Sequence, residues 1–355
     1  MVITYIYANN LADQIRVQVR CRNMADAINR TGVHRANLLD MALFIQNTDQ
    51  AKKICGDSDL LVVYRYLYGP ILTAVQYWKA RDKKVVVDFD QAFNFLTDGK
   101  PAYSFWYGGI PLDGVDFLDG AVISPPPIEQ FKWGLALVDG ATVPSARLVD
   151  DWSRFTTVHK VLDYINTHHY PTSDHIHGDE IWIGLGNRVD YDCFESSGLL
   201  VAMENVCRKL PHVKLVVSSI EEKFTTLHID SEQLKIFSLQ HFEDWVDVLL
   251  HLDVGLMPIS GNYDLRLGSY DLLEFMISKI PWIASEERTF HKLTQYGQWV
   301  RNLSDAWEIS ILNTLEHLDA QKRKAAGEPF LFALNQDISA NISSVLHVYA
   351  AIIKH

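Results

Sequence analysis

The segment Asp253–Ser285 reads DVGLMPISGNYDLRLGSYDLLEFMISKIPWIAS and decides the fold class of this chain. Asp253–Ile259 is an almost wholly apolar run, as expected for a parallel strand covered on both faces by helices. A polar loop with glycines follows. From Ser269 the apolar residues take helical spacing, until Pro281 precedes the short strand Trp282–Ala284. The segment therefore predicts a βαβ unit.

Glu274 interrupts the apolar pattern of the predicted helix, one turn after its start. The loop before this helix lies at the carboxyl end of a strand, where open α/β sheets bind nucleotide phosphates. A glutamate placed there can accept hydrogen bonds from both hydroxyls of a nucleotide ribose. The alternative is an ordinary helical glutamate that faces solvent.

The residues around this glutamate form a recognisable signature. They are Arg266, Ser269, Tyr270, Asp271, Leu273, Glu274, Phe275 and Met276, followed by Lys279 to Ser285. This signature resembles the carboxyl domain of retaining, GT-B-fold glycosyltransferases of the family 4-like group (glycosyl transferases group 1). The resemblance implies an α/β protein with two Rossmann-like doubly wound domains facing a central cleft, and it makes Glu274, Ser269 and Tyr270 donor-binding residues.

The composition suits two domains of ordinary size, since the chain has 355 residues of which 48% are hydrophobic. The sequence has no run of about 18 apolar residues, and its start, MVITYIYANN, enters a strand without a basic region or a cleavage site. We therefore expect a soluble, cytoplasmic protein. The four cysteines show no paired spacing and are interpreted as buried small hydrophobic residues: Cys21, Cys55, Cys193 and Cys207.

Charge is unevenly shared along the chain. Residues 1–160 hold equal numbers of basic and acidic residues, so the formal net charge of −12 falls on the rest, which argues against nucleic acid as a partner. One helix-sized region is nevertheless rich in arginine: Arg16, Arg20, Arg22, Arg30 and Arg35. This basic stripe either faces an anionic membrane surface or a lipid-diphosphate acceptor, as a peripheral contact, or is a solvated helix face.

The first half alternates strands with helices, which predicts a mainly parallel sheet. The expected strands are Val2–Ala8, Met41–Gln46, Leu60–Tyr64, Val85–Asp88 and Ala141–Pro144, with helices around 13–31, 49–55, 69–81 and 128–138. The stretch 59–90 again resembles the same family, in its acceptor domain, which often has an acidic pair after this strand. Asp88 or Asp90 would then orient the acceptor hydroxyl as a catalytic residue. A plain strand-end turn is the alternative.

Asp88-Phe89-Asp90 is also a DxD, the pair that holds a divalent metal on the diphosphate in the other large glycosyltransferase fold. That fold would leave the second βαβ series, from 180 to 285, unexplained. In the two-domain fold, helix amino termini and basic side chains neutralise the diphosphate. We therefore expect neither a metal nor a cofactor.

The predicted domains are 1–165, which binds the acceptor, and 166–335, which binds the nucleotide-sugar donor. Residues 336–355 are expected to form a helix that crosses back to the first domain. A linker at about 163–178 contains Pro171 and four histidines: His168, His169, His175 and His177. Because these histidines lack the spacing of a metal site, a polar hinge is favoured over a zinc site.

The second half opens with a strand that runs into a glycine turn, where Gly184 and Gly186 let backbone amides approach a phosphate. In the resembled family this turn, here including Asn187 and Arg188, faces the donor diphosphate, and the loop ending in Gln240 contacts the base. The further elements expected are a helix over 191–209, strands at Val213–Ser218 and Leu234–Phe237, and closing helices at 304–320 and 325–354.

Arg266 departs from the family pattern, because many relatives have a glutamate eight residues before the ribose-binding glutamate. An arginine cannot act as a base, but its fork of donors suits a diphosphate leaving group. We therefore assign Arg266 to stabilising the departing nucleotide, where charge grows in the transition state. The usual arginine-lysine clamp is also reduced, since only Arg188 lies near the glycine turn.

The sequence thus predicts a glycosyltransferase that moves a hexose from a nucleotide diphosphate sugar to a saccharide or lipid-linked acceptor in polysaccharide biosynthesis. The resemblance implies retention of configuration. UDP-glucose is the first donor to consider, ahead of UDP-galactose or a GDP-linked sugar. Two alternatives stay open: a non-catalytic protein that binds sugar nucleotides or glycans on a decayed scaffold, and a sugar-nucleotide epimerase.

Overall fold

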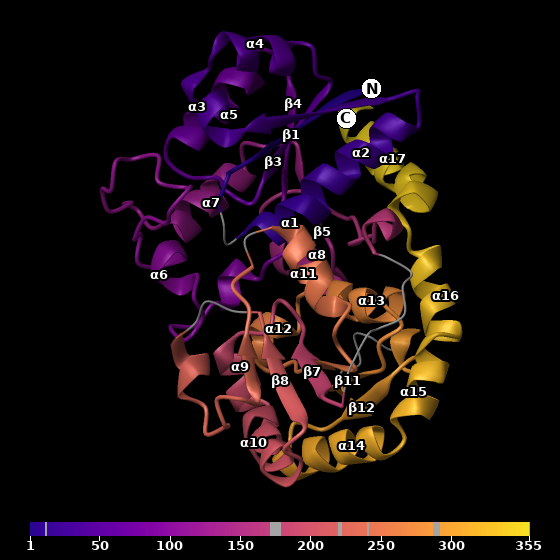
Figure 1. The fold of residues 1–355 in the computed structure, drawn as a ribbon. Coiled ribbons are helices and arrows are strands. Elements are labelled where there is room, and N and C mark those ends of the chain that lie inside the picture. Colours follow the sequence, from indigo (N-terminus) through magenta and orange to yellow (C-terminus); the bar gives the residue numbers. More distant parts are fainter. Residues whose placement is uncertain (11–12, 171–178, 219–221, 240, 287–291, 355) are drawn as a thin grey trace. The chain divides into compact units, whose positions relative to one another are not determined.

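The computed structural model describes residues 1–10, 13–170, 179–218, 222–239, 241–286 and 292–354 (Figure 1). The chain forms two compact units. Unit 1 contains Met1–Tyr164, Arg266–Gly268 and Ile338–His355, and unit 2 contains Ile165–Leu265 and Ser269–Asp337.

Unit 1 is built on a six-stranded sheet in the order β2-β1-β3-β4-β5-β6, and all of its strand pairs are parallel. The strands are β1 (Val2–Tyr7), β2 (Arg35–Asp40), β3 (Leu60–Tyr64), β4 (Lys84–Asp88), β5 (Gly140–Val143) and β6 (Val158–Lys160). Every residue of β3 is buried, as expected for a central strand with helices on both faces. The strand order reverses between β1 and β3, so the topological switch point of this sheet lies there.

Helices surround this sheet, and several begin at a residue whose side chain caps them. They are α1 (Gln14–Val17), a π-helical stretch (Gln18–Arg22), α2 (Asn23–Arg30), α3 (Met41–Gln46), α4 (Asp49–Gly56), α5 (Pro70–Lys79), α6 (Tyr103–Trp106), α7 (Pro127–Leu135), α8 (Ala146–Trp152) and α17 (Ile338–Lys354). Thr48 caps α4 and Ser145 caps α8. The last helix, α17, packs against α2 and shares the core of unit 1 (Figure 1).

The expected strand at Met41–Gln46 is wrong, because this segment is helix α3 and the strand is the preceding β2. Asp40 ends the strand and accepts a hydrogen bond from the backbone of Ala42, which starts the helix. The two buried side chains of α3, Met41 and Phe44, are three residues apart, which is helical spacing.

Unit 2 has a second parallel sheet, in the order β12-β11-β10-β7-β8-β9. The strands are β7 (Ile181–Leu185), β8 (Val213–Val217), β9 (Leu234–Ile236), β10 (Val254–Met257), β11 (Trp282–Ser285) and β12 (Gln298–Val300). Counted within the unit, this is the 3-2-1-4-5-6 order of dinucleotide-binding sheets, whose switch point lies between β7 and β10.

The helices of unit 2 include the one that carries Glu274. They are α9 (Tyr191–Ser196), α10 (Leu199–Lys209), α11 (Phe242–Leu249), α12 (Gly261–Asp264), α13 (Tyr270–Ile277), α14 (Ser304–Glu316), α15 (Leu318–Ala325) and α16 (Glu328–Asn335). The βαβ unit expected over 253–285 is confirmed as β10, α13 and β11.

Three expected helices of the second half are divided in the structure. The helix over 191–209 is broken at Gly198, which has a φ of 79° and precedes α10. The closing helices are four rather than two, with Pro329 in the first turn of α16. Among the described residues, no helix is both long and apolar enough to cross a membrane.

Candidate functional site

The switch point of unit 2 brings together the turn after β7 and helix α13, which follows β10 along the chain. Ligands of doubly wound sheets bind at the carboxyl ends of strands where the strand order reverses. β7 and β10 are direct neighbours, with Gly184 paired to Gly255 and Leu185 to Leu256. The expected donor-binding residues of the 184–188 turn and of α13 therefore lie in one place within unit 2.

Glu274 is fully buried, so the alternative of a solvent-facing helix residue is wrong. The Tyr170 hydroxyl donates to its Oε1 at 2.9 Å, and Asn187 Nδ2 donates to its Oε2 at 3.1 Å. Burial, followed by the negative charge of Glu274, raises the pKa of Tyr170 well above its usual value, so its hydroxyl stays protonated and able to donate. The Tyr170 and Tyr270 hydroxyls are also 3.1 Å apart.

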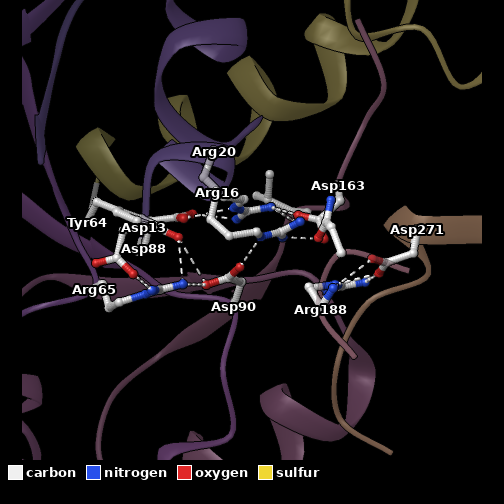
Figure 2. A network of polar contacts seen from close by, with 12 residues as sticks. Asp13, Arg16, Arg20, Tyr64, Arg65, Asp88, Asp90, Asp163, Arg188 and Asp271 are labelled. Carbon is white, nitrogen blue, oxygen red and sulfur yellow. Dashed lines mark hydrogen bonds and ion pairs between the residues drawn. The ribbon is translucent and has the colours of Figure 1, made fainter. Parts of the chain in front are cut away.

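Asp271 lies one turn before Glu274 on the same face of α13 and binds Arg188 (Figure 2). Arg188 donates from Nε to Asp271 Oδ2 at 2.5 Å, and its Nη2 contacts the same oxygen. The Arg188 backbone N–H also points at Asp271 Oδ1, at 3.4 Å. Two carboxylates of α13 therefore hold the Asn187-Arg188 dipeptide.

Both glycines are closely packed: Gly184 lies within strand β7, and Gly186 lies in the turn after it. A Cβ on Gly184 would lie 2.4 Å from a Leu252 methyl carbon. A Cβ on Gly186 would lie 3.1 Å from the Met257 sulfur and 3.2 Å from Asp271 Oδ1. A Cβ would displace Leu252 at position 184 and would only crowd its neighbours at position 186, and the expected approach of both glycines to a phosphate stays a prediction.

Two further donor-side residues were expected, Ser269 and Gln240. Ser269 is the residue before α13 and makes no side-chain capping bond. Gln240, the expected base contact, lies outside the described residues. Ser238 and Leu239 before it line an open cavity of about 510 Å³ along α11, together with Phe237, His241, Asp244, Asp247, Val248 and His251.

Arg266 belongs to unit 1, where its guanidinium pairs with Asp151. Arg266 donates from Nε at 2.5 Å and from Nη2 at 3.2 Å to the two carboxylate oxygens of Asp151. Its Cζ lies 3.5 Å from the ring centre of Phe95, a cation–π contact. The Arg266 backbone carbonyl accepts a hydrogen bond from Ser145 Oγ. Its expected role with the leaving diphosphate stays a prediction, and in that role it would exchange Asp151 for phosphate oxygens.

Asp88 and Asp90 lie at the carboxyl end of β4, almost without exposure (Figure 2). Arg20 donates from Nε and Nη2 to the two oxygens of Asp88, at 2.9 and 2.5 Å. Arg16 donates to Asp90 at 2.5 Å, and Arg65 donates to the same carboxylate at 2.8 Å. Arginines therefore hold both aspartates, whose expected role with the acceptor stays a prediction.

Asp163 and Asp13 extend this cluster. Asp163 accepts from Arg16 at 2.9 Å and from Arg20 at 3.0 Å, while Asp13 pairs with Arg65. Three arginines and four aspartates thus form the buried network, which reaches the switch point of unit 1 because Asp13 follows β1 and Arg65 follows β3.

Burial and ion pairing oppose each other in this network. Burial raises the pKa of Asp90, but Arg16 and Arg65 together outweigh it and hold that pKa well below its usual value. Burial dominates for Asp13 and Asp88, whose pKa values are raised despite their arginines. Asp90 is therefore held in its ionised form more firmly than Asp13 or Asp88, which makes it a poor base.

The buried network corrects the interpretation of the basic stripe for two of its five arginines, and the peripheral contact expected of the other three stays a prediction. Arg16 and Arg20 are 6% and 1% exposed, so they face neither a membrane surface nor solvent. They are four residues apart, which places them on one side of the helix, turned into unit 1. The other arginines of the stripe are exposed: Arg22, Arg30 and Arg35.

The described residues contain no group of three or more histidine, cysteine, aspartate or glutamate side chains that could hold a metal ion. Of the linker residues, His168 and His169 are described, whereas Pro171, His175 and His177 are outside the described residues. All four cysteines are buried, as expected.

No family model and no curated protein matches the sequence. Among solved structures, the chain is similar to sucrose-phosphate synthase from Thermosynechococcus elongatus, with 12% identity and a TM-score of 0.66 over 100% of this chain and 99% of that chain. It is also similar to TarM of S. aureus, with 14% identity and a TM-score of 0.57 over 88% of this chain and 58% of that one.

A third similar structure is UDP-GlcNAc 2-epimerase from Neisseria meningitidis bound to UDP-GlcNAc, with 10% identity and a TM-score of 0.52 over 99% and 100% of the two chains. At such identities the likeness shows the fold. The expected α/β architecture, with two Rossmann-like doubly wound domains of the GT-B type, is confirmed.

Proposed function

We propose that this chain is a glycosyltransferase that transfers a hexose from a nucleotide diphosphate sugar to a saccharide or lipid-linked acceptor in polysaccharide biosynthesis. UDP-glucose is the first candidate donor. The family 4-like resemblance adds retention of anomeric configuration, with the donor diphosphate deprotonating the acceptor. The GT-B fold supports this proposal, since sucrose-phosphate synthase and TarM share it.

The observation that carries the proposal is the place of Glu274. It is fully buried at the switch point of unit 2, and two neutral groups, the Tyr170 hydroxyl and the Asn187 amide, donate to its oxygens. A ribose offers two hydroxyl donors. It can therefore replace these groups without leaving the buried carboxylate unsatisfied, which would otherwise be costly.

The other roles follow from the same proposal. Arg266 would stabilise the departing diphosphate, because a guanidinium meets phosphate oxygens through two parallel hydrogen bonds. Asp88 or Asp90 would orient the acceptor hydroxyl. Ser269 and Tyr270 would line the donor site at the start of α13.

The first test is a calorimetric titration of the full chain with UDP and with GDP, in the absence of metal. UDP is expected to bind the wild type, and Glu274→Gln is expected to lose about tenfold or more in affinity, because the amide loses the negative charge and has a donor in place of one acceptor oxygen. Glu180→Gln is the matched control, since Glu180 is exposed and belongs to the same unit. If neither nucleotide binds the wild type, the proposal fails.

The second test measures chemistry. Incubation with UDP-glucose is expected to release UDP slowly by hydrolysis, and faster when an acceptor is present. The anomeric proton of the product, observed by NMR, reports retention or inversion. Tight UDP binding without release from any UDP-sugar or GDP-sugar would instead support the non-catalytic alternative.

The epimerase alternative has one observation in its favour, the similarity over 99% of this chain to a UDP-GlcNAc 2-epimerase bound to UDP-GlcNAc. An epimerase would convert UDP-GlcNAc without an acceptor and without net release of UDP. Proton NMR of the chain incubated with UDP-GlcNAc distinguishes this outcome, because a new set of sugar signals would appear while the nucleotide stays attached.

A further inference from the structure

Helix α13 presents two buried carboxylates, Asp271 and Glu274, spaced so that both point to the turn after β7. Each has a relative exposure of 0%. Glu274 binds Asn187, and Asp271 binds the next residue, Arg188. The proposed function gives Glu274 a role with the ribose, and it leaves the purpose of Asp271 unexplained.

Asp271 contacts the turn at three points. Its Oδ2 accepts from Arg188 Nε at 2.5 Å and pairs with Nη2, and its Oδ1 faces the Arg188 backbone N–H at 3.4 Å. Backbone and side chain of Arg188 are therefore fixed by the same carboxylate.

The Arg188–Asp271 ion pair is better explained by the orientation it gives the guanidinium than by a gain in stability. A buried ion pair loses much of its Coulomb energy to desolvation, so it is weak evidence for stability. A guanidinium carries five N–H donors in a planar fork, and a carboxylate that engages one edge sets the plane of the whole group. The side chain of Arg188 is only 11% exposed, so Asp271 orients a largely buried guanidinium.

We propose that Asp271 is a positioning residue for nucleotide binding: it holds the Arg188 guanidinium in the orientation in which it meets the diphosphate of the donor. This inference rests on the proposed function and deepens it. Arg188 touches the phosphates, and Asp271 acts through Arg188. The nucleoside part of the ligand is bound by the neighbouring Glu274.

The proposal separates two contributions to affinity. UDP and uridine share the ribose and the base, so the ratio of their dissociation constants measures the diphosphate contribution alone. Asp271 should affect this ratio and leave uridine affinity nearly unchanged. A purely structural role would lower the stability of unit 2 and weaken both ligands together.

The experiment titrates the full chain with UDP and with uridine, without metal, for wild type, Arg188→Met, Asp271→Asn and the double variant. The wild type is expected to prefer UDP by about tenfold or more. Each single variant and the double variant are expected to lose most of this preference to the same extent, because residues that act as one unit are not additive. Uridine affinity should change by less than about threefold.

Asp253→Asn is the matched control. Asp253 is also buried in unit 2 and ion-paired, with Lys322 at 2.5 Å, but it precedes β10 at the opposite end of the strand. This variant should lower the melting temperature and keep the preference for UDP. If Asp271→Asn fails to fold, Arg188→Lys replaces it: lysine keeps the charge but lacks the fork, so the preference for UDP should fall.

The outcomes are distinct. An unchanged preference in Asp271→Asn, together with its loss in Arg188→Met, overturns the inference and leaves the proposed function standing. Full preference in Arg188→Lys, or equal binding of UDP and uridine by the wild type, also overturns it. A wild type that binds neither ligand contradicts the proposed function itself.

Discussion

Arg20 has no exposed side-chain surface and binds two aspartates and a backbone carbonyl. Its guanidinium donates to Asp88, to Asp163 and to the Val161 carbonyl oxygen. Such a group is costly to bury and more costly to remove, because its carboxylate partners would remain in the interior without a counter-charge.

We therefore expect Arg20→Met to lower the free energy of unfolding by about 3–5 kcal/mol. The measurement is urea denaturation followed by tryptophan fluorescence. Arg22→Met is the control two residues away: Arg22 is exposed and lies 5.5 Å from the ring of Tyr7, so a change of about 0.5–1 kcal/mol is expected. Equal effects of the two substitutions would show that the network adds nothing to stability.

Tyr170 competes with any ribose for Glu274, since its hydroxyl already donates to Oε1. Tyr170→Phe removes this competitor and keeps the ring, which contacts Phe242 edge-on at 6.1 Å. UDP affinity is expected to rise by about twofold to tenfold, the value of one hydrogen bond. Calorimetry measures the change, and Tyr349→Phe in unit 1 is the control. A loss of affinity would mean that the Tyr170 hydroxyl binds the nucleotide itself.

At the residue scale, the sequence pointed to Glu274 because it interrupts an apolar helix at the carboxyl end of a strand. It did not reveal the partners of Arg16 and Arg20. Helical spacing shows that two arginines share a face, and it does not show whether that face meets solvent or the carboxylates of a strand far away in sequence. The sequence did contain an indication of these partners, because Asp88 and Asp90 are two acidic residues at the end of a predicted buried strand.

At the scale of elements, the carboxylate of Asp139 links three elements of unit 1. Asp139 is the residue before β5, and its partners lie in α5 and β4. Asp139 accepts from Lys79 Nζ at 2.5 Å, from Lys84 Nζ at 3.2 Å and from the Val85 backbone at 2.9 Å. Burial raises the pKa of Asp139, but these hydrogen bonds outweigh it and lower that pKa below its usual value.

A carboxylate with a depressed pKa in the folded state stabilises the protein above its unfolded pKa, and this contribution is lost as the pH falls through the folded pKa. Asp139→Asn is therefore expected to cost about 1.5–3 kcal/mol near neutral pH and progressively less below about pH 4. Unfolding curves across this pH range measure the difference. Asp150→Asn on α8, which is exposed, is the control and should change the free energy of unfolding by no more than about 0.5 kcal/mol near neutral pH.

Helix α3 shows why an element can be assigned wrongly from its composition. The run Met41–Gln46 is apolar enough for a strand, and short apolar runs do not distinguish a strand from a buried helix turn. The capping bond of Asp40 and the pairing of β2 with β1 decide the matter. The capping bond is local, whereas the strand pairing depends on a strand about 30 residues away in sequence.

At the scale of the whole molecule, the chain ends in the unit with which it begins. Helix α17 follows unit 2 in sequence, but it completes the core of unit 1 with Ile338, Val345 and Tyr349. The Tyr5 and Tyr349 hydroxyls are 3.2 Å apart, across 344 positions of sequence.

We expect Ile352→Ala to destabilise unit 1 by about 2–5 kcal/mol, because Ile352 is buried and its removal leaves a cavity. Hydrogen exchange should accelerate in β1 and α2 and stay unchanged in α14 of unit 2. Ser344→Ala, an exposed change on the same helix, is the control. Faster exchange in α14 alone would contradict the assignment of α17 to unit 1.

The sequence by itself determined the alternation of strands and helices, the two doubly wound halves and the placement of Glu274 in the helix between two strands, because these depend on local periodicity and on residues close in the chain. Tertiary structure alone decided the strand orders, the burial of Arg16 and Arg20, and the pairing of Arg188 with Asp271 and of Arg266 with Asp151. A charged side chain finds its partner in space, and the fold sets which carboxylate comes within reach.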